Sequence, residues 1–442
     1  MAWRKAFAGL AATAAVAAGL TACGSSDNTE AASAPKDPAA VKGDITFLTN
    51  RTDLQTDGTW KKYVAQFNQK YPNVHVKVEG DTNYEDDVKT RMNDPHGYGD
   101  VLLIPNAVAP EQYPQYFESL GSSVQLADTY RFDAPKSVGG KQYGIALGGN
   151  ANGVLYNTQV WKQAGITSLP KSPDEFLKDL QTIKAKTKAI PLYTNYKDGW
   201  PLGGQWTNLV GSVSGDPDAL NAMAYNKAPW TEGTDIYAID KLLFDSVHDG
   251  LTESDPLTTN WEQSKGDFAS GKIATMVLGS WAITQFQAAA KDAGAPASNV
   301  GFMSFPASVD GKQYSTIAGD YFLAVNKNSD NKPAAEAWLH WLIDDSDFTN
   351  SQGMISAVKT APLPSNLKGL QDSGVTLLEL NPAKPGEESR LSDTADQSQV
   401  DIWGNLYRQK LVDVARGQAD GDLESFFAQL NKEWGQAVSD LS

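Results

Sequence analysis

After the N-terminal region, segments with the residue pattern of β-strands alternate with segments whose apolar residues recur at helical spacing. Residues 45–48 and 74–78 have the pattern of β-strands, and residues 101–104 form a short continuous apolar run. Between them, aromatic and aliphatic residues recur at helical spacing over residues 60–71, and residues 84–93 suit a polar helix. A short continuous apolar run is typical of a strand buried in a parallel sheet. This β-α-β-α-β order predicts the α/β class, with an open parallel sheet covered by helices on both faces.

Polar residues follow the predicted strands at the end where such sheets bind their ligands. Ligands of open α/β sheets lie at the carboxyl ends of the strands. Asn50, Arg51 and Asp53 come directly after the first predicted strand. Asn150 and Asn152 lie in a glycine-rich segment that we interpret as a crossover between two parts of the fold. These five residues are therefore candidates for ligand contact.

Length and charge narrow the possible functions. The chain has 442 residues, and a single core stops growing at ~250–300 residues, so two domains are expected. The 53 acidic residues exceed the 37 Lys and Arg, which argues against nucleic acid as a partner, because phosphate binding depends on Lys and Arg. Four histidines without short ligand spacing and one cysteine favour neither a metal site nor a disulfide. No cofactor is expected.

Residues 1–22 have the layout of a secretory signal peptide. Arg4 and Lys5 precede an apolar run that consists mostly of alanine. A spanning helix needs roughly 20 strongly apolar residues, so this weak run favours cleavage over the alternative of a transmembrane anchor. Residues 23–43 are mostly small or polar, which predicts a flexible tether.

The residues Leu-Thr-Ala-Cys at positions 20–23 resemble the lipobox of bacterial lipoproteins. In that family the cysteine is acylated and becomes the first residue of the mature chain. The resemblance implies a lipid anchor on Cys23, and two acyl chains hold a protein on a membrane stably. It places the mature chain on the outer face of the cytoplasmic membrane. We expect a Gram-positive host, in which such a tether keeps an exported protein near the cell.

A series of further segments follows the lipobox in a characteristic order. They are Tyr-Gly-Ile through Gly-Val-Leu-Tyr-Asn at 143–157, Trp-Lys-Gln-Ala-Gly-Ile at 161–166, a segment ending in Gly-Ser-Trp at 268–281, and Ala-Val-Asn-Lys-Asn-Ser at 324–329. Together they resemble the extracellular solute-binding proteins of ABC transporters, in the carbohydrate-binding cluster that includes maltose-binding protein. The resemblance implies two α/β lobes of the periplasmic-binding-protein type, each a mostly parallel sheet flanked by helices, joined by hinge crossovers.

The resemblance also implies a function and a division of the chain. The N-terminal lobe would contain residues 44–150 and 280–320, and the C-terminal lobe residues 151–279 and 321–442. The protein would bind a mono- or oligosaccharide between the lobes and deliver it to a membrane permease by hinge closure. It would be a monomer without catalytic activity.

Sugars present C–H faces and hydroxyl edges, and a site for them needs matching side chains. Aromatic rings give a large contact area on the faces at low entropy cost. Asn, Asp and Arg supply paired donors and acceptors for the edges. The predicted ligand-binding residues of these kinds are Asn50, Arg51, Asp53, Asn150, Asn152, Asn195, Tyr196, Trp200, Trp206, Trp281, Asp320 and Tyr321.

Several of these residues also suit a purely structural role. Trp281 follows Gly-Ser at the end of a predicted strand and is either a ligand platform or an ordinary core residue. Trp200 and Trp206 lie in a loop rich in glycine and proline, which could instead be clamped onto its own lobe. Arg51 and Asp53 could pair with each other as a local salt bridge.

Two other functions remain as alternatives. A secreted glycoside hydrolase would use two carboxylates in an aromatic cleft, and Asp53, Glu253, Asp255 and Asp320 are available. A chain with 53 acidic residues contains such sets by chance, Asp320 also suits a turn, and a doubly wound sheet is not a usual glycosidase fold. The second alternative is an ABC-importer binding protein for an amino acid, a peptide or a polyamine. A polyamine would need several carboxylates beside the aromatic residues.

Overall fold

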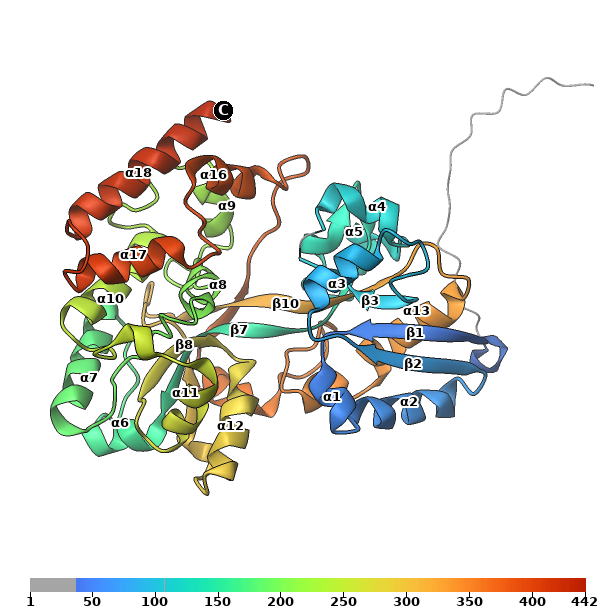
Figure 1. Ribbon diagram of the computed structural model, residues 1–442, viewed down its shortest axis with the longest axis horizontal. Coiled ribbons are helices and arrows are strands. Elements are labelled where there is room, and N and C mark those ends of the chain that lie inside the picture. Colours follow the sequence, from blue (N-terminus) through green and yellow to red (C-terminus); the bar gives the residue numbers. More distant parts are fainter. Residues whose placement is uncertain (1–36, 107) are drawn as a thin grey trace, which may run out of the picture. The chain divides into compact units, whose positions relative to one another are not determined.

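An eight-stranded mixed sheet organises the fold (Figure 1). The computed structural model describes residues 37–106 and 108–442, so the predicted signal peptide and Cys23 lie outside the described residues. The strands follow the order β2-β1-β3-β10-β7-β8, with β11 beside β10 and β9 beside β7. They are β1 (Gly43–Thr49), β2 (Val74–Gly80), β3 (Val101–Leu103), β7 (Ile145–Asn157), β8 (Thr275–Gly279), β9 (Val300–Met303), β10 (Tyr314–Val325) and β11 (Thr376–Glu379).

The first three strands confirm the predicted β-α-β-α-β order. β1 pairs in parallel with both β2 and β3. The helix predicted over residues 60–71 is α2 (Thr59–Lys70), which buries Trp60 and Phe67. Trp60 stacks on Phe348 with 4.9 Å between ring centroids. The Trp60 ring also lies 5.2 Å from the ring of Phe47 in β1. Burial of an apolar side chain of this size contributes about 1.5–3 kcal/mol, so the aromatic face of α2 holds the helix on the sheet.

Two long strands pass from one half of the main sheet to the other. β7 has 13 residues and β10 has 12, and they run antiparallel side by side (Figure 1). Leu323 of β10 pairs with both Leu103 of β3 and Ile145 of β7. The opposite halves of the two strands pair with β8, β9 and β11. We call the elements around β1, β2 and β3 the N-terminal lobe and those around β8 and β9 the C-terminal lobe.

The lobe boundaries differ from those expected from the sequence. Residues 321–325 pair with β3 in the N-terminal lobe, and α13 (Lys332–His340) packs against β1 and β3. β9 pairs with the C-terminal half of β7. The assignments of residues 280–320 to the N-terminal lobe and of residues 321–442 to the C-terminal lobe are therefore wrong at these elements. The physical reason is that both long strands change partners midway along their length.

The C-terminal lobe is built mainly from helices. α10 packs against α7 and α17, and α18 packs against α16 and α17. Trp206, Trp230 and Trp434 lie in the core that these helices enclose. The helices other than α2 and α13 are α1 (Thr52–Thr56), α3 (Tyr84–Arg91), α4 (Tyr113–Tyr116), α5 (Ser123–Leu126), α6 (Thr158–Ala164), α7 (Pro173–Lys186), α8 (Gly204–Thr207), α9 (Ala219–Met223), α10 (Asp235–His248), α11 (Trp261–Ala269), α12 (Ala282–Asp292), α14 (Phe348–Ser351), α15 (Lys368–Asp372), α16 (Arg390–Ser398), α17 (Leu406–Ala415) and α18 (Leu423–Asp440).

A small second sheet decorates the N-terminal lobe. Its strands are β4 (Gly121–Ser122), β6 (Lys141–Gln142) and β5 (Ser137–Val138), in that spatial order. β6 pairs antiparallel with both of its neighbours. It immediately precedes β7, so the small sheet leads the chain into the first long strand.

The folded body begins before the predicted end of the tether. Residues Pro38–Ala40 form a short 3-10 helix, and Val41 is only 2% exposed in the core. Asn73 Nδ2 donates a hydrogen bond to the Ala39 carbonyl at 2.8 Å. The tether expected over residues 23–43 is therefore corrected at its end, because these last residues pack against the N-terminal lobe. Among the described helices, none combines the length and apolarity needed to cross a bilayer.

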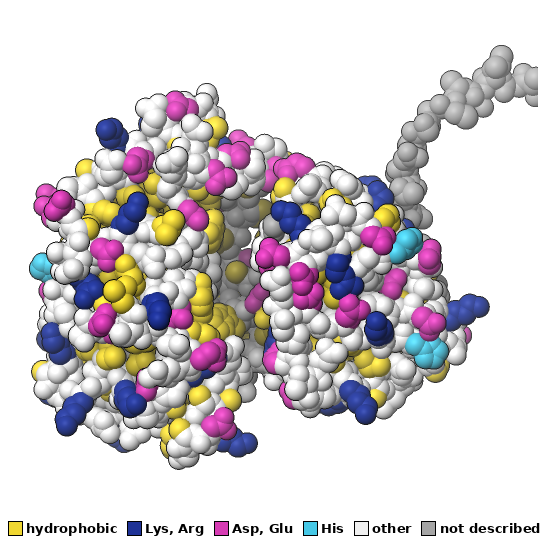
Figure 2. Space-filling model, in the orientation of Figure 1, with side chains coloured by type: hydrophobic (Ala, Val, Ile, Leu, Met, Phe, Trp, Pro, Cys, Tyr) yellow, Lys and Arg dark blue, Asp and Glu magenta, His cyan; other side chains and the backbone are white. Residues whose placement is uncertain are grey.

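Charged side chains are interspersed on the surface. On the face shown in Figure 2, Lys and Arg lie among Asp and Glu on both lobes. Exposed pairs such as Lys70–Asp345 and Lys368–Asp372 form salt bridges. Such pairs contribute little to stability because water screens them. The fold therefore depends on its apolar cores rather than on surface charge.

Candidate functional site

Three tryptophan side chains of the C-terminal lobe pack against one another. Trp200 begins a short 3-10 helix, Trp261 begins α11, and Trp281 follows the Gly-Ser at the end of β8. The ring centroids lie 5.0 Å apart for Trp200 and Trp261, 5.8 Å for Trp200 and Trp281, and 5.7 Å for Trp261 and Trp281. We call these three residues the tryptophan cluster.

Trp200 is the exposed member of the tryptophan cluster. It is 41% exposed, whereas Trp261 and Trp281 are partly buried. The Trp261 ring also contacts Phe286, and Lys265 Nζ lies 4.9 Å from its centre. The two partly buried rings therefore brace Trp200, whose exposed surface is available to a ligand.

A polar cluster lies where β7 and β10 pass from one lobe to the other. Asn150 Nδ2 donates to Asp320 Oδ2 at 3.2 Å, and the Tyr321 backbone N–H donates to Asp320 Oδ1 at 2.8 Å. Arg51 Cζ lies 5.9 Å from the centre of the Tyr321 ring. Arg51 also donates two hydrogen bonds to Asp53, at 2.9 and 2.7 Å. The structure thus brings these five predicted residues together, and we call them the polar cluster.

Tyr321 has a left-handed backbone in the middle of β10. Its φ is 52°, a conformation that bulky residues rarely adopt and that costs on the order of 1–3 kcal/mol. The neighbours Asp320 and Phe322 keep their pairing with Gly148 and Ala146 of β7. The strain is therefore confined to one residue, and Tyr321 faces Arg51 at this position.

Burial and the Arg51–Asp53 pair together set the protonation behaviour of the polar cluster. It raises the pKa of Asp320, an effect that the Tyr321 N–H and Arg51 only partly offset. Burial likewise raises the pKa of Tyr321 to about 12, so the phenol keeps its proton at neutral pH. Burial also pushes the pKa of Asp53 upward, but the Arg51 hydrogen bond and charge, with backbone donors, hold it below its ordinary value. The cluster therefore offers a hydroxyl, an amide and an ion pair side by side.

The two clusters are neighbours across β7. Asn152 pairs with Gly279 of β8, two residues before Trp281, and Asn150 lies two residues earlier on β7. Gly279 must lack a side chain, because an added Cβ would lie 2.6 Å from Trp281 Cδ1. The pairing of Gly279 with Asn152, together with the bond from the Ser280 N–H to the Ala151 carbonyl at 2.8 Å, places Trp281 near the middle of β7, where the polar cluster also contacts the strand.

Trp206 has a structural role instead of the predicted ligand contact, and Asn152 joins two strands. Trp206 is only 2% exposed and lies in the core of the C-terminal lobe. Asn152 is buried, and its Nδ2 donates to the Thr316 carbonyl and to Thr316 Oγ1, both at 3.3 Å. Core packing corrects the prediction for Trp206, whereas ligand contact by Asn152 stays a prediction.

The remaining predicted residues have mixed outcomes. Asn50 is exposed beside the polar cluster. Asn195 is buried with a φ of 56°, and its Oδ1 has no hydrogen-bond partner in the described part of the chain. Tyr196 OH donates to both carboxylate oxygens of Asp413, each at 3.0 Å. The Tyr196 hydroxyl is thus engaged within its own lobe.

Trp261 is absent from the predicted site residues. The sequence leaves two roles open for this tryptophan, ligand contact or burial by a helix that Thr258 or Thr259 opens. The helix begins instead at Trp261, because Asn260 Oδ1 accepts from the Gln263 N–H at 2.9 Å as the N-cap. Asn is a preferred N-cap residue, so Asn260 is the signal that could have placed Trp261 at the helix end.

Trp403 is a second exposed tryptophan that the sequence does not single out. It is 42% exposed and lies just before α17. The Trp403 backbone N–H donates to Asp401 Oδ1 at 3.0 Å. A Cβ added to Gly203 would lie 2.4 Å from the Trp403 carbonyl oxygen. The Trp403 backbone therefore packs against the segment that follows Trp200.

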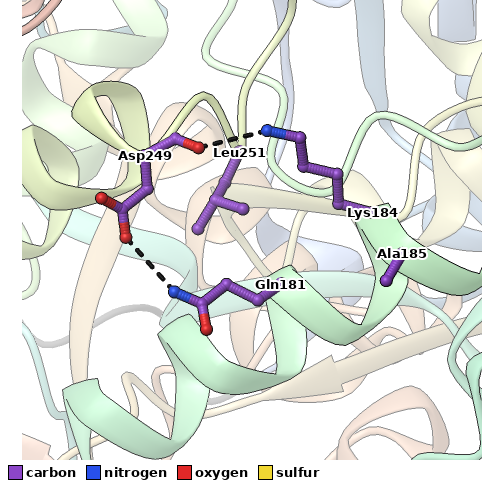
Figure 3. Close-up of a pocket in the computed structure, with 5 residues that line it drawn as sticks. All are labelled: Gln181, Lys184, Ala185, Asp249 and Leu251. Atoms are coloured by element: carbon purple, nitrogen blue, oxygen red, sulfur yellow. Dashed lines mark hydrogen bonds between the residues drawn. The ribbon is translucent and has the colours of Figure 1, made fainter.

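A pocket on the surface of the C-terminal lobe has a structural explanation. It is lined by Gln181, Lys184, Ala185, Asp249 and Leu251 (Figure 3). Lys184 Nζ donates to the Asp249 carbonyl at 3.2 Å, and Gln181 Nε2 donates to Asp249 Oδ2 at 3.3 Å. A lysine at this position satisfies the carbonyl end of α10. None of the predicted site residues lines this pocket.

Known proteins share this arrangement of elements. The family model for bacterial extracellular solute-binding proteins matches residues 52–347. The chain belongs to this family. The matched part of this solute-binding protein contains the tryptophan cluster and most of the polar cluster.

Solved structures of oligosaccharide-binding relatives resemble this solute-binding protein closely. A manno-oligosaccharide specific solute binding protein, BlMnBP2 from Bifidobacterium animalis subsp. lactis, was solved in complex with mannotriose. It is 36% identical, with 92% of this chain and 96% of that chain covered and a TM-score of 0.82. BlMnBP1 from the same organism, a binding protein of an ABC transporter solved with mannobiose, has the same identity, coverage and TM-score. These matches confirm the two-lobe α/β fold.

A curated relative is also named for sugar binding. The multiple sugar-binding protein of Streptococcus mutans is 23% identical over 400 residues, which are 87% of this chain and 89% of the relative. All three of these relatives are binding proteins and none is named as an enzyme.

Proposed function

We propose that this solute-binding protein binds an oligosaccharide between its lobes and delivers it to the permease of an ABC importer. The observation that carries the proposal is the tryptophan cluster next to the polar cluster, on either side of the middle of β7. An exposed ring beside paired polar groups suits a sugar, which has an apolar face and hydroxyl edges.

An unpartnered amide oxygen supports a ligand with hydroxyl donors. Asn150 Oδ1 is buried and has no hydrogen-bond partner among the described residues. A buried acceptor without a donor costs about 1–3 kcal/mol. A sugar hydroxyl that reached this atom would remove the cost. Neighbouring Asp320 and the Arg51–Asp53 pair supply further groups for hydroxyl edges.

The substrate class that we propose is a manno-oligosaccharide. The two relatives at 36% identity were solved with mannotriose and mannobiose and cover more than nine tenths of both chains. The multiple sugar-binding relative points to the broader class of sugars. A neutral oligosaccharide also suits the aromatic surface around Trp200 better than a polyamine, which needs several free carboxylates.

The four carboxylates available to a glycoside hydrolase all have hydrogen-bond partners within the protein. Asp320 accepts from Asn150 Nδ2 and from the Tyr321 N–H. Asp53 is bound by Arg51, and Glu253 accepts from the backbone N–H of Thr194 at 3.0 Å and from its hydroxyl. Asp255 Oδ1 accepts from the Leu257 N–H at 3.1 Å as a helix cap. These bonds support a protein that binds sugar without cleaving it.

We further propose that the protein acts as a monomer, without a cofactor, on the outer face of the cytoplasmic membrane of a Gram-positive cell. The support for the location is the lipobox-like sequence that ends at Cys23. A lipid on Cys23 would anchor the protein beside the permease. Opening and closing about β7 and β10 would give the permease a ligand-dependent shape to recognise.

Isothermal titration of the purified protein tests the proposed function. Mannotriose should bind saturably, and its affinity should change little with salt because a neutral ligand gains nothing from charge. Spermidine and a neutral tripeptide are the comparison ligands. Salt-sensitive binding of spermidine without binding of mannotriose would overturn the proposal. Release of mannose from mannotriose during a long incubation would support the hydrolase instead.

A further inference from the structure

The loop that carries Trp200 has an unusual and closely fixed backbone. Asn195 and Gly199 both have positive φ, 56° and 77°. The Gly199 N–H donates to the Asn195 carbonyl at 3.1 Å, and the Trp200 N–H donates to the Asp198 carbonyl at 2.9 Å. Residues 194–200 therefore make a tight turn directly before the exposed ring, and small changes in this turn would move Trp200.

Helix α17 holds this loop through one row of side chains. Gln409 Nε2 donates to the Tyr196 carbonyl at 2.7 Å, and Asp413 accepts from Tyr196 OH at 3.0 Å. Asn405, at the N-cap of α17, donates to Gln409 Oε1 at 2.8 Å. A Cβ added to Gly199 would lie 2.5 Å from Asn405 Nδ2, so this side chain lies directly against the turn.

The spacing of these side chains explains why they act together. Asn405, Gln409 and Asp413 are four residues apart, so they lie on one face of the helix. They contact the loop at Tyr196 and Gly199, on the two sides of its tight turn. We call these three residues the α17 row. Residues from elsewhere fix the start of the loop, since Glu253 accepts from Thr194.

We propose that the α17 row, together with Tyr196, positions Trp200 as a sugar platform before the ligand arrives, without touching the ligand itself. This inference rests on the proposed function, because it assumes that Trp200 contacts sugar. A loop that is ordered in advance does not lose its freedom during binding. Tyr196 then contributes to affinity as a positioning residue, in place of the direct ligand contact predicted from the sequence.

Single substitutions measure the contribution of the row. Tyr196→Phe removes only the hydroxyl that Asp413 accepts, and we expect mannotriose to bind about three- to tenfold more weakly, the change that one hydrogen bond produces. Asp413→Ala should have the same effect. Asp413→Asn should have a smaller one, because its amide oxygen still accepts from the phenol. Unchanged affinity in Tyr196→Phe would overturn the inference.

The chain offers a matched control. Tyr225 OH donates to Glu387 Oε2 at 2.6 Å on the surface of the same lobe. Tyr225→Phe removes the same kind of bond away from the loop and should leave mannotriose affinity unchanged. Equal losses in Tyr196→Phe and Tyr225→Phe would show a general effect on the lobe and would overturn positioning of Trp200.

A double-mutant cycle separates positioning from direct contact. In the Trp200→Ala background, Tyr196→Phe should cost almost nothing further, because the platform is already gone. Independent, additive losses would mean that Tyr196 touches the sugar and would overturn the inference. If Trp200→Ala alone left mannotriose affinity unchanged, Trp200 would not contact the sugar, and the inference would be overturned.

Hydrogen exchange tests the row without any ligand. Amides of residues 194–200 should exchange faster in Tyr196→Phe than in the unmodified protein, while those of Tyr225→Phe should not change. Faster exchange without binding of any sugar would support the role of the α17 row in fixing the loop but would reject the proposed function. Unchanged exchange would show that the α17 row does not fix the loop, even if the protein binds sugar.

Discussion

Arg408 and Asp240 form an ion pair that is fully enclosed in the C-terminal lobe. Arg408 Nε lies 2.8 Å from Asp240 Oδ1, and neither side chain is exposed. Arg408 Nη1 also donates to the carbonyls of Leu202 and Gly203, at 3.1 and 2.9 Å. The pair therefore joins α17 to α10 and to the segment directly after Trp200.

Loss of this arginine should destabilise the protein strongly. Arg408→Met leaves Asp240 buried without its cation, which costs about 3–5 kcal/mol of unfolding free energy. Urea unfolding followed by circular dichroism measures this loss. Lys368→Met breaks the exposed pair with Asp372 and is the matched control, with little expected change. Equal midpoints for the two variants would show that the buried pair adds nothing.

Removal of a ring from the tryptophan cluster should weaken sugar binding while the fold persists. Trp281→Ala should lower mannotriose affinity by one to a few kcal/mol, because Trp200 loses a bracing ring and the site loses an aromatic surface. Calorimetric titration and thermal unfolding of the same sample check both parts. Trp206→Ala is the contrasting variant, since a core tryptophan should cost about 3–5 kcal/mol of stability. If Trp281→Ala unfolds the protein and the folded fraction binds normally, Trp281 belongs to the core.

Glu253 should make stability depend on pH in the acid range. Burial raises its pKa above the ordinary value of 4.5, so the folded state holds the proton more tightly than the unfolded state. Stability from this group is therefore present below about pH 4.5 and is lost as pH rises toward the raised value. The glutamine in Glu253→Gln cannot ionise. The melting temperature of this variant should therefore rise relative to that of the unmodified protein as pH increases through this window. Parallel melting curves across the window would contradict the raised pKa.

Replacement of the single cysteine should release the protein from the cell. Cys23→Ala removes the only thiol that could carry a lipid. We expect the variant in the culture medium, with unchanged affinity for mannotriose, because the binding residues lie elsewhere. Immunoblots of membrane and medium fractions measure the distribution. Retention of the variant in the membrane fraction would exclude anchoring through Cys23.

Local sequence patterns predicted the elements whose partners are close in the chain. Residues 45–48 and 74–78 are strands as expected, residues 101–103 of the predicted run 101–104 form β3, and residues 60–71 lie almost entirely in α2. Periodicity suffices there, because the spacing of the apolar residues alone distinguishes a strand from a helix, whichever residues they later contact. The family resemblance supplied the two-lobe fold that the periodicity alone leaves open.

Contacts between distant residues could not be predicted in this way. Trp200 and Trp206 lie in the same loop, which is rich in glycine and proline, but only Trp206 enters the core. Tyr196 looks like a ligand contact until Asp413, on a distant helix, is placed beside it. The lobe boundaries were wrong because β10 exchanges partners at its middle, and no local pattern marks the point of exchange.

The change of strand partners along β10 has a consequence for how the protein forms. The sheet of the N-terminal lobe stays incomplete until residues 321–325 pair with β3, and the chain makes most of the C-terminal lobe first. Contacts between residues so far apart in sequence form slowly. The sheet of the N-terminal lobe therefore cannot be completed in a newly made chain until residues 321–325 have been synthesised.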